Sequence, residues 1–169
     1  MMIRVVVDTN VLVAGLIGGK KPNREILRRC LEGDLQPYVG NALYLEYQNL
    51  LNRESVQAFC QQTLVSLMEF LDGFAQVCKA VDARYLWRPN LRDEADNHLV
   101  GLAIAASAAY IITNNVSDFA CAELKLLGYE VITPEQLLRL LRSWQPYPFD
   151  YPMIWRKGSR VSPKSATSA

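Results

Sequence analysis

Short apolar segments alternate with amphipathic segments along most of this chain, and this alternation restricts the folds that it can adopt. The first apolar segment, Ile3–Val7, is rich in β-branched residues, as is typical of a strand buried on both faces. Strands are expected at 3–7, 35–39, 74–81, 109–113 and 129–132. Helices are expected over about 22–32, 42–52, 56–73, 95–108, 119–127 and 134–144. The alternation predicts an α/β fold of three α/β/α layers, with a central five-stranded parallel sheet covered by helices on both faces.

Capping residues mark the starts of three of these helices. Asn41 is expected to cap the helix over 42–52, and Ser55 the longer helix that follows it. Thr133 precedes Pro134, and Gln136 comes three positions after Thr133, which is the pattern of a capping box. This last helix is therefore expected to begin at Pro134.

The chain has 169 residues, enough for one domain with a substantial core. We expect this domain to occupy residues 1–144. From Gln145 onward the pattern of strands and helices stops, and four prolines occur in a basic segment. Residues 145–169 are therefore expected to form a tail that is partly disordered. Apolar side chains in its first half are able to attach that half to the domain, namely Phe149, Tyr151, Ile154 and Trp155.

Charge, hydropathy and cysteine content exclude several classes of protein. The formal net charge is +1, which excludes a strongly basic nucleic-acid binder but not a nuclease with a local basic rim. No apolar run approaches the length of a membrane span, and the N-terminus lacks the features of a signal peptide, so a cytoplasmic protein is expected. The four cysteines form no close pair and only one histidine is present, so we expect buried free thiols and no zinc site.

Two acids follow expected strands at the edge of the sheet where ligands bind in such folds. Asp8 comes directly after the first strand, and Asp118 lies in the loop after the fourth. If the strand order of the sheet is 3-2-1-4-5, as is expected for the fold class, these two loops are neighbours. Asp8 can also be part of a simple turn, and Asp118 can be a helix cap. An acid directly after a Val-rich first strand favours the functional interpretation of Asp8.

Two further acids interrupt apolar patterns. Glu46 shares a helix face with Leu43, Tyr47 and Leu50 in the segment 42–52, although it can also be solvated at the edge of that face. Asp96 lies in the first turn of an apolar helix, where it can equally interact with the helix dipole. A buried carboxylate is unfavourable by several kcal/mol unless something compensates its charge.

A divalent cation would compensate a cluster of these four carboxylates. Oxygen ligands without cysteine or histidine indicate a hard ion, Mg²⁺ or Mn²⁺, one or two of which would suit phosphoryl chemistry. The single histidine, His98, is expected to be a structural or rim residue. A phosphatase of the haloacid dehalogenase kind would need an acid at position 10, where this chain has Asn10.

Four segments together resemble the PIN-domain family, and within it the bacterial branch of toxin components of toxin–antitoxin systems. They are Val-Asp-Thr-Asn-Val-Leu-Val at 7–13, the helix around Glu46, Arg-Asp-Glu-Ala-Asp-Asn-His-Leu at 92–99 and Ile-Thr-Asn-Asn-Val-Ser-Asp-Phe at 112–119. The resemblance covers about residues 3–140. It implies an Mg²⁺- or Mn²⁺-dependent endoribonuclease that hydrolyses single-stranded RNA, forms a homodimer or higher oligomer, and is inhibited by a small antitoxin protein.

The resemblance also assigns roles to individual residues. It implies catalytic roles for Asp8, Glu46, Asp96 and Asp118, and metal ligation by Asp8, Asp96 and Asp118. It implies supporting or substrate-contacting roles for Thr9, Asn10, Thr113 and Asn115. Ala95 and Asn97 stand where many relatives have acids, which leaves Asp93 as a possible substitute.

Three arginines before the Asp93 segment are candidates for contacting RNA. Arg84, Arg88 and Arg92, spaced by four, can steer RNA phosphates toward the metal or simply form a solvated rim.

The alternative function is a catalytically degenerate PIN-type module that binds RNA or a protein. Loss of metal binding would distinguish it from the enzyme.

Overall fold

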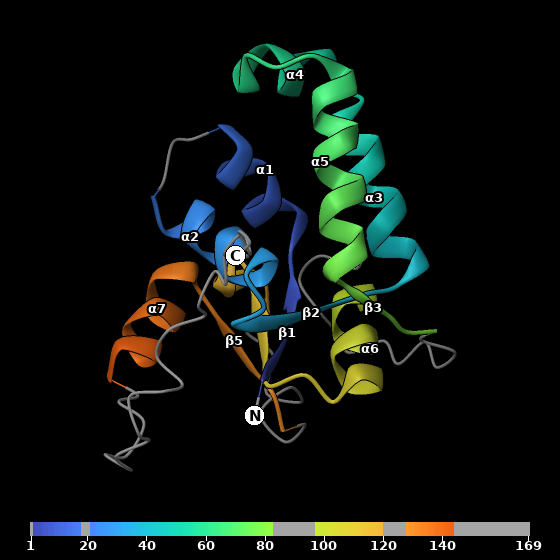
Figure 1. The fold of residues 1–169 in the computed structure, drawn as a ribbon. Coiled ribbons are helices and arrows are strands. Elements are labelled where there is room, and N and C mark those ends of the chain that lie inside the picture. Colours follow the sequence, from blue (N-terminus) through green and yellow to red (C-terminus); the bar gives the residue numbers. More distant parts are fainter. Residues whose placement is uncertain (1, 18–20, 83–96, 120–127, 144–169) are drawn as a thin grey trace, which may run out of the picture.

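The computed structural model describes residues 2–17, 21–82, 97–119 and 128–143. Five strands form one parallel sheet, and their order is β3-β2-β1-β4-β5 (Figure 1). The strands are β1 (Ile3–Val7), β2 (Leu35–Val39), β3 (Lys79–Ala80), β4 (Tyr110–Ile112) and β5 (Glu130–Ile132). The predicted fold class and strand order are confirmed.

Helices cover both faces of this sheet. They are α1 (Thr9–Ile17), α2 (Lys21–Leu31), α3 (Asn41–Leu51), α4 (Glu54–Cys60), α5 (Leu64–Val77), α6 (Asn97–Ala106) and α7 (Pro134–Ser143), with a 3-10 turn, η2 (Val116–Phe119). Figure 1 shows α1, α2 and α7 on one side of the sheet and α3, α5 and α6 on the other, with α4 at the far end of α5. No helix in these described ranges is long and apolar enough to cross a membrane.

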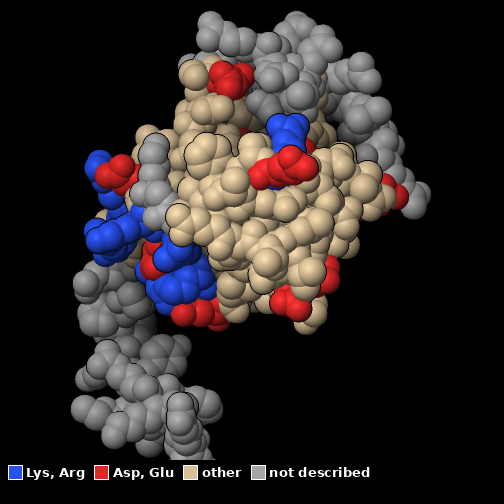
Figure 2. Space-filling model, turned by 90° about the horizontal axis from the view of Figure 1, so that it is seen from above, with Lys and Arg blue, Asp and Glu red and all other residues tan. Residues whose placement is uncertain are grey.

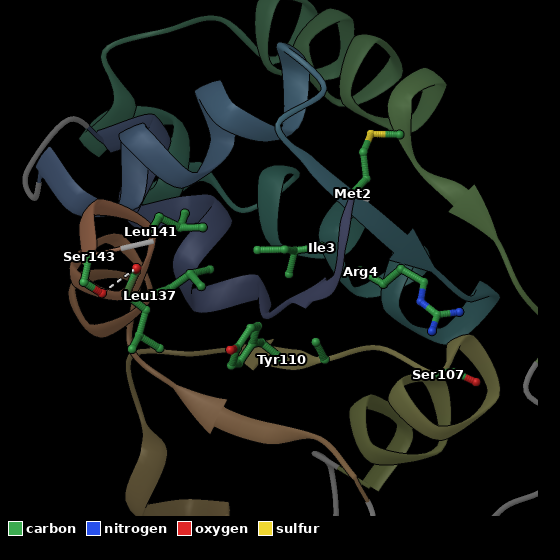
Figure 3. Close-up of a pocket in the computed structure, with 10 residues that line it drawn as sticks. Met2, Ile3, Arg4, Ser107, Tyr110, Leu137, Leu141 and Ser143 are labelled. Carbon is green, nitrogen blue, oxygen red and sulfur yellow. Dashed lines mark hydrogen bonds between the residues drawn. The ribbon is translucent and has the colours of Figure 1, made fainter. Parts of the chain in front are cut away.

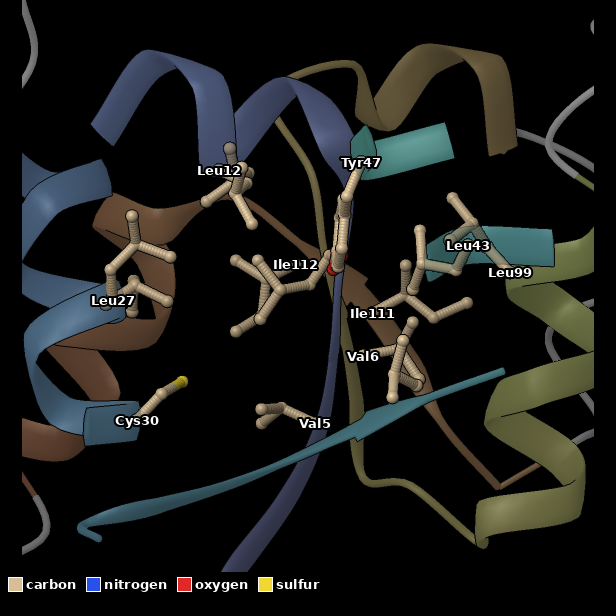
Figure 4. Close-up of a cluster of buried hydrophobic side chains, with 14 of the residues drawn as sticks. Val5, Val6, Leu12, Leu27, Cys30, Leu43, Tyr47, Leu99, Ile111 and Ile112 are labelled. Atoms are coloured by element: carbon tan, nitrogen blue, oxygen red, sulfur yellow. The ribbon is translucent and has the colours of Figure 1, made fainter. Parts of the chain in front are cut away.

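The core lies on both faces of β1, as its β-branched composition predicts. Val5, Val6 and Val7 are at most 1% exposed. Successive strand residues point to opposite faces, so Val5 faces α2, where Cys30 lies, and Val6 faces the opposite layer (Figure 4). Burial on both sides fixes the position of β1, and therefore of the residue that follows it.

The third strand and the helix before it differ from their predicted bounds. The strand expected over 74–81 is only Lys79–Ala80, because α5 continues to Val77. Phe74 is buried and continues the helical stripe of Leu67 and Leu71, so the spacing of three and four residues determines the structure there. The helix expected over 56–73 is two helices, since Gln61 between them has a left-handed backbone with φ of 51°.

The predicted caps have different outcomes. Gly40 and Arg53 are the N-caps of α3 and α4, so Asn41 and Ser55 lie inside the first turns and do not cap them. The capping box before α7 is confirmed: Thr133 Oγ1 accepts from Gln136 N at 3.2 Å, and Gln136 Oε1 accepts from Thr133 N at 2.8 Å. The helix expected over 119–127 lies outside the described residues, apart from Phe119 at the end of η2.

The cysteines in the described ranges are free thiols. Cys30 and Cys60 are buried, Cys78 is half-buried, and Cys121 lies outside these ranges. Burial raises the pKa of the Cys78 thiol to about 12, and it raises that of Cys30 further. These thiols are therefore protonated at neutral pH and contribute to packing.

Candidate active site

Asp8 lies at the carboxyl end of β1, where the last strand pairing holds its backbone. Its N–H donates to the carbonyl of Ile112 at 2.9 Å, and its side chain is in a residue only 5% exposed. Thr113, directly after β4, is held in the same way by the carbonyl of Ile132 at 3.0 Å. The parallel register of β1 and β4 therefore brings Asp8 and Thr113 together, as the predicted strand order requires.

Neutral donors surround the Asp8 carboxylate. Its Oδ2 accepts from Thr113 Oγ1 at 2.6 Å and from Asn10 Nδ2 at 2.7 Å. Its Oδ1 lies 3.0 Å from the hydroxyl of Thr9. Hydrogen bonds to an ionised group are shorter and stronger than those between neutral groups, and they offset part of the cost of burying this charge.

Thr113 connects these donors and is fully buried. Besides donating to Asp8, its Oγ1 accepts from Asn10 Nδ2 and from the backbone N–H of Asn115, each at 3.0 Å. A hydroxyl has one proton and two lone pairs, so the hydrogen-bonding capacity of this group is fully used. The predicted supporting roles of Thr9, Asn10 and Thr113 thus correspond to direct contacts, whereas Asn115 contributes its backbone and its side chain is exposed.

Sequence reasoning missed Asn114. Its backbone N–H donates to Asn10 Oδ1 at 3.0 Å, and its Nδ2 lies 3.3 Å from both the Oδ1 and the carbonyl oxygen of Asn10. These bonds fasten the segment after β4 to the first turn of α1. The second Asn of the Thr-Asn-Asn segment was a signal, because Asn side chains readily bond to backbone groups in such loops.

Glu46 reaches this cluster from α3. Its neighbour Tyr47 is buried, and the Tyr47 hydroxyl donates to the carbonyl of Val7, the last residue of β1. This anchor places Glu46 Oε1 at 3.0 Å from Thr9 Oγ1, the hydroxyl that also contacts Asp8. Thr9 has one hydroxyl proton, so it can donate to only one of the two carboxylates at a time.

His98, in the first turn of α6, pairs with the other side of Glu46. Its Nε2 lies 3.0 Å from Glu46 Oε2. The hydrogen bond from His98 lowers the pKa of the Glu46 carboxyl, burial opposes this shift, and Thr9 reinforces it. The expectation of a structural or rim residue did not foresee this contact. A signal was present, because His98 is three and four positions before the buried Gly101 and Leu102 and therefore faces inward.

Asp118 lies on η2, and none of its hydrogen bonds to described residues joins it to the Asp8–Glu46 cluster. Its Oδ1 is 3.4 Å from Ser117 Oγ, its backbone N–H donates to the carbonyl of Asn115, and it is half-buried. Asp93 and Asp96, and the predicted steering residues Arg84, Arg88 and Arg92, lie outside the described residues. In the described ranges no three acidic, histidine or cysteine side chains form a group arranged to hold a metal ion.

Three of the described arginines, Arg28, Arg29 and Arg139, lie beside acids. Seen from above, Lys and Arg gather near one edge of the molecule with Asp and Glu among them, and most of that face is uncharged (Figure 2). On α2, Arg28 and Arg29 pair with Glu25 at 2.6 and 3.0 Å. The arginines of the basic rim expected for RNA lie outside the described residues, so these pairs do not test it.

The donor set fits a hard divalent ion. Two carboxylates, one of them 5% exposed, converge on one hydroxyl, and the nearby side-chain oxygens are those of threonine and asparagine. Mg²⁺ and Mn²⁺ prefer such oxygen ligands. Asp8 and Glu46 are therefore the residues that would hold or orient such an ion.

Comparison with known proteins supports this architecture. The fold is similar to that of a chain in the crystal structure of VapBC2 from Rickettsia felis bound to a DNA fragment from their promoter, with a TM-score of 0.54 and 14% sequence identity. The match covers 78% of this chain and 98% of the other, and at this identity it shows the fold alone. No curated protein matches the sequence.

The family model of the PIN domain matches residues 4–117. This range is well over half of the chain, contains the whole Asp8–Glu46 cluster, and ends one residue before Asp118. Sequence match, strand order and the polar cluster at the carboxyl ends of β1 and β4 agree, and they make this chain a member of the PIN-domain family.

Proposed function

We propose that this protein is a metal-dependent endoribonuclease that hydrolyses phosphodiester bonds of single-stranded RNA. The observation that carries the proposal is the convergence of the buried Asp8 carboxylate and the Glu46 carboxylate on the hydroxyl of Thr9. Two negative charges so close together repel a phosphodiester unless a cation lies between them. The cation, Mg²⁺ or Mn²⁺, would polarise a phosphate oxygen and activate water.

The residues of the chain have distinct tasks in this proposal. Asp8 would hold the ion, with Asp96 and Asp118 as further ligands and Asp93 as a substitute. Glu46 orients the attacking water, because its lowered pKa keeps it an anion that accepts a hydrogen bond at neutral pH. Thr9, Asn10 and Thr113 hold Asp8 in one orientation before substrate binds. Such preorganisation lowers the cost of reaching the transition state.

We further infer that the protein is the toxin of a toxin–antitoxin pair, a cytoplasmic homodimer or higher oligomer inhibited by a small antitoxin. The VapBC2 likeness is consistent with this partner, although it concerns the fold. A catalytically degenerate module that binds RNA or protein is the second candidate. The observation that favours it is that only two carboxylates, Asp8 and Glu46, converge within the described ranges.

Cleavage of a labelled single-stranded RNA tests the proposal. We expect cleavage with Mn²⁺, none with EDTA, and a loss of at least about 100-fold in Asp8→Asn, which replaces an anion with a neutral amide. Asp72→Asn, an exposed acid on α5, is the matched control and should keep full activity. If the wild-type protein neither cleaves RNA nor binds Mn²⁺ by calorimetry, the degenerate module replaces the enzyme.

A further inference from the structure

An apolar groove lies at the end of the sheet opposite the Asp8–Glu46 cluster. Its walls are α7 on one side and the first residues of β1 and β4 on the other (Figure 3). The cavity has a volume of about 330 Å³. Among its lining residues, Met2 is 52% exposed and Leu140 is 46% exposed. Large apolar side chains here are thus not covered by the described part of the chain.

The chain continues directly from this groove. Ser143, the last described residue of α7, lines the groove, and residues 144–169 follow it. The segment 144–155 is rich in apolar side chains: Trp144, Tyr147, Phe149, Tyr151, Met153, Ile154 and Trp155. Aromatic side chains gain the most from burial. Because the segment is covalently attached at the edge of the groove, its effective concentration there is in the millimolar range or above.

Prolines restrict the conformations of this segment. Pro146, Pro148 and Pro152 fix their own φ angles, and each also disfavours helix at the residue before it. The unbound segment is thus biased toward extended structure. A chain that is already extended loses less conformational entropy when it docks along a groove.

The charges of the groove and the segment are complementary. Among the described residues that line the groove, Arg4 alone is charged; it is exposed, and it makes no ion pair with a described residue. Asp150 is the one charged residue of 144–155. Arg4 and Ser143 lie at opposite ends of the groove in Figure 3. Asp150 is seven residues after Ser143. An extended chain advances about 3 Å per residue, so the chain can reach roughly 20 Å from Ser143 by Asp150.

We propose that segment 144–155 docks in this groove, with its aromatic side chains against Met2, Leu140 and Tyr110 and with Asp150 paired to Arg4. The tail then has two parts: a docked part, 144–155, and a part beyond it, 156–169, that does not contribute to the fold. Because the groove is at the far end of the sheet, docking stabilises the domain without contacting the Asp8–Glu46 cluster.

A charge-reversal cycle in the full chain tests this pairing. The melting temperature is measured for Arg4→Glu, Asp150→Arg and the double variant at low salt. Each single change is expected to lower it by about 1–3 °C, and the double variant is expected to recover most of that loss. Arg142→Glu combined with Asp150→Arg is the control, since Arg142 is exposed on α7 but does not line the groove. It should show no coupling.

Two truncations test the apolar part of the proposal. Ending the chain at residue 156 should leave the melting temperature within about 1 °C, whereas ending it at residue 143 should lower the melting temperature by more than about 5 °C. An unchanged melting temperature in both truncations, or no coupling in the charge-reversal cycle, would overturn the proposal and leave the groove to another occupant, such as a second copy of the chain. If the chain that ends at residue 143 does not fold, the charge-reversal cycle alone decides. The test requires no RNA cleavage, so it stands apart from the proposed nuclease activity.

Discussion

Replacing Thr113 by valine should destabilise the protein more than its small change of shape suggests. Valine keeps the volume of the fully buried side chain but removes its hydroxyl. The Asp8 carboxylate then loses its 2.6 Å donor, a bond to a charged group that contributes about 1.5–3 kcal/mol. The Asn115 N–H loses its acceptor, and Asn10 Nδ2 keeps only its bond to Asp8. We expect a loss of about 3 kcal/mol in the free energy of unfolding.

Urea denaturation followed by circular dichroism measures this loss. About 3 kcal/mol corresponds to a melting temperature lower by about 6–12 °C for a chain of this size, with an unchanged slope against urea concentration. Thr113→Ser is the matched control, because it keeps the hydroxyl and removes only a buried methyl group, which costs about 1 kcal/mol. If the valine variant is no less stable than the serine variant, the hydroxyl does not hold the two loops together and our account of the site is wrong.

Two further predictions concern α3. Glu46→Gln should lower the free energy of unfolding near neutral pH. The pKa of Glu46 is lower in the folded state than in the unfolded state, so the ionised carboxylate stabilises the fold above the unfolded pKa. This stabilisation disappears as the carboxylate is protonated, so the difference from wild type should shrink as the pH falls below about 4.5. A difference that stays constant between pH 3 and pH 7 in urea titrations would contradict this. Tyr47→Phe leaves the Val7 carbonyl without the Tyr47 hydroxyl and should cost about 1–3 kcal/mol. A loss below about 0.5 kcal/mol by the same assay would show that Tyr47 does not anchor Glu46.

The position of Asp8 was predictable because it depends on one strong pattern. A buried strand must end, and in a parallel sheet the residue that follows it lies at the ligand-binding edge. The places of Asp8 and Thr113 follow from this rule, and the structure brings them together. Glu46 was predictable in position from its helix face. The inward face of His98 was also readable from its spacing, but its contact with Glu46 was not, because the rotation of α6 relative to α3 depends on packing between distant segments.

The predicted third strand shows where local patterns mislead. Phe74 to Val81 contains enough apolar residues for a strand, but Phe74 also continues the stripe of Leu67 and Leu71. For a short apolar run these two periods cannot be separated by composition. The longer helix buries more apolar surface in the core and leaves a strand of only two residues, Lys79–Ala80. The same competition does not arise at β1, where burial on both faces leaves no polar side for a helix.

The donors around Asp8 change what its burial means. The sequence alone indicates that a buried acid needs a cation to compensate its charge. In the structure, Asn10 and Thr113 already satisfy Oδ2 of Asp8 with two short hydrogen bonds. Burial of Asp8 by itself is therefore weak evidence for a metal. The stronger evidence lies at Oδ1, whose closest donor is the Thr9 hydroxyl, a group equally close to Glu46 and able to serve only one of them. Oδ2 of Asp8 is held by two short hydrogen bonds, whereas Oδ1 accepts from the Asn10 N–H at 3.4 Å and otherwise depends on the Thr9 hydroxyl that it shares with Glu46. Because Asp8 and Glu46 share the single proton of Thr9, one of the two carboxylates lacks this donor at any time. A cation bound by both carboxylates would compensate for it.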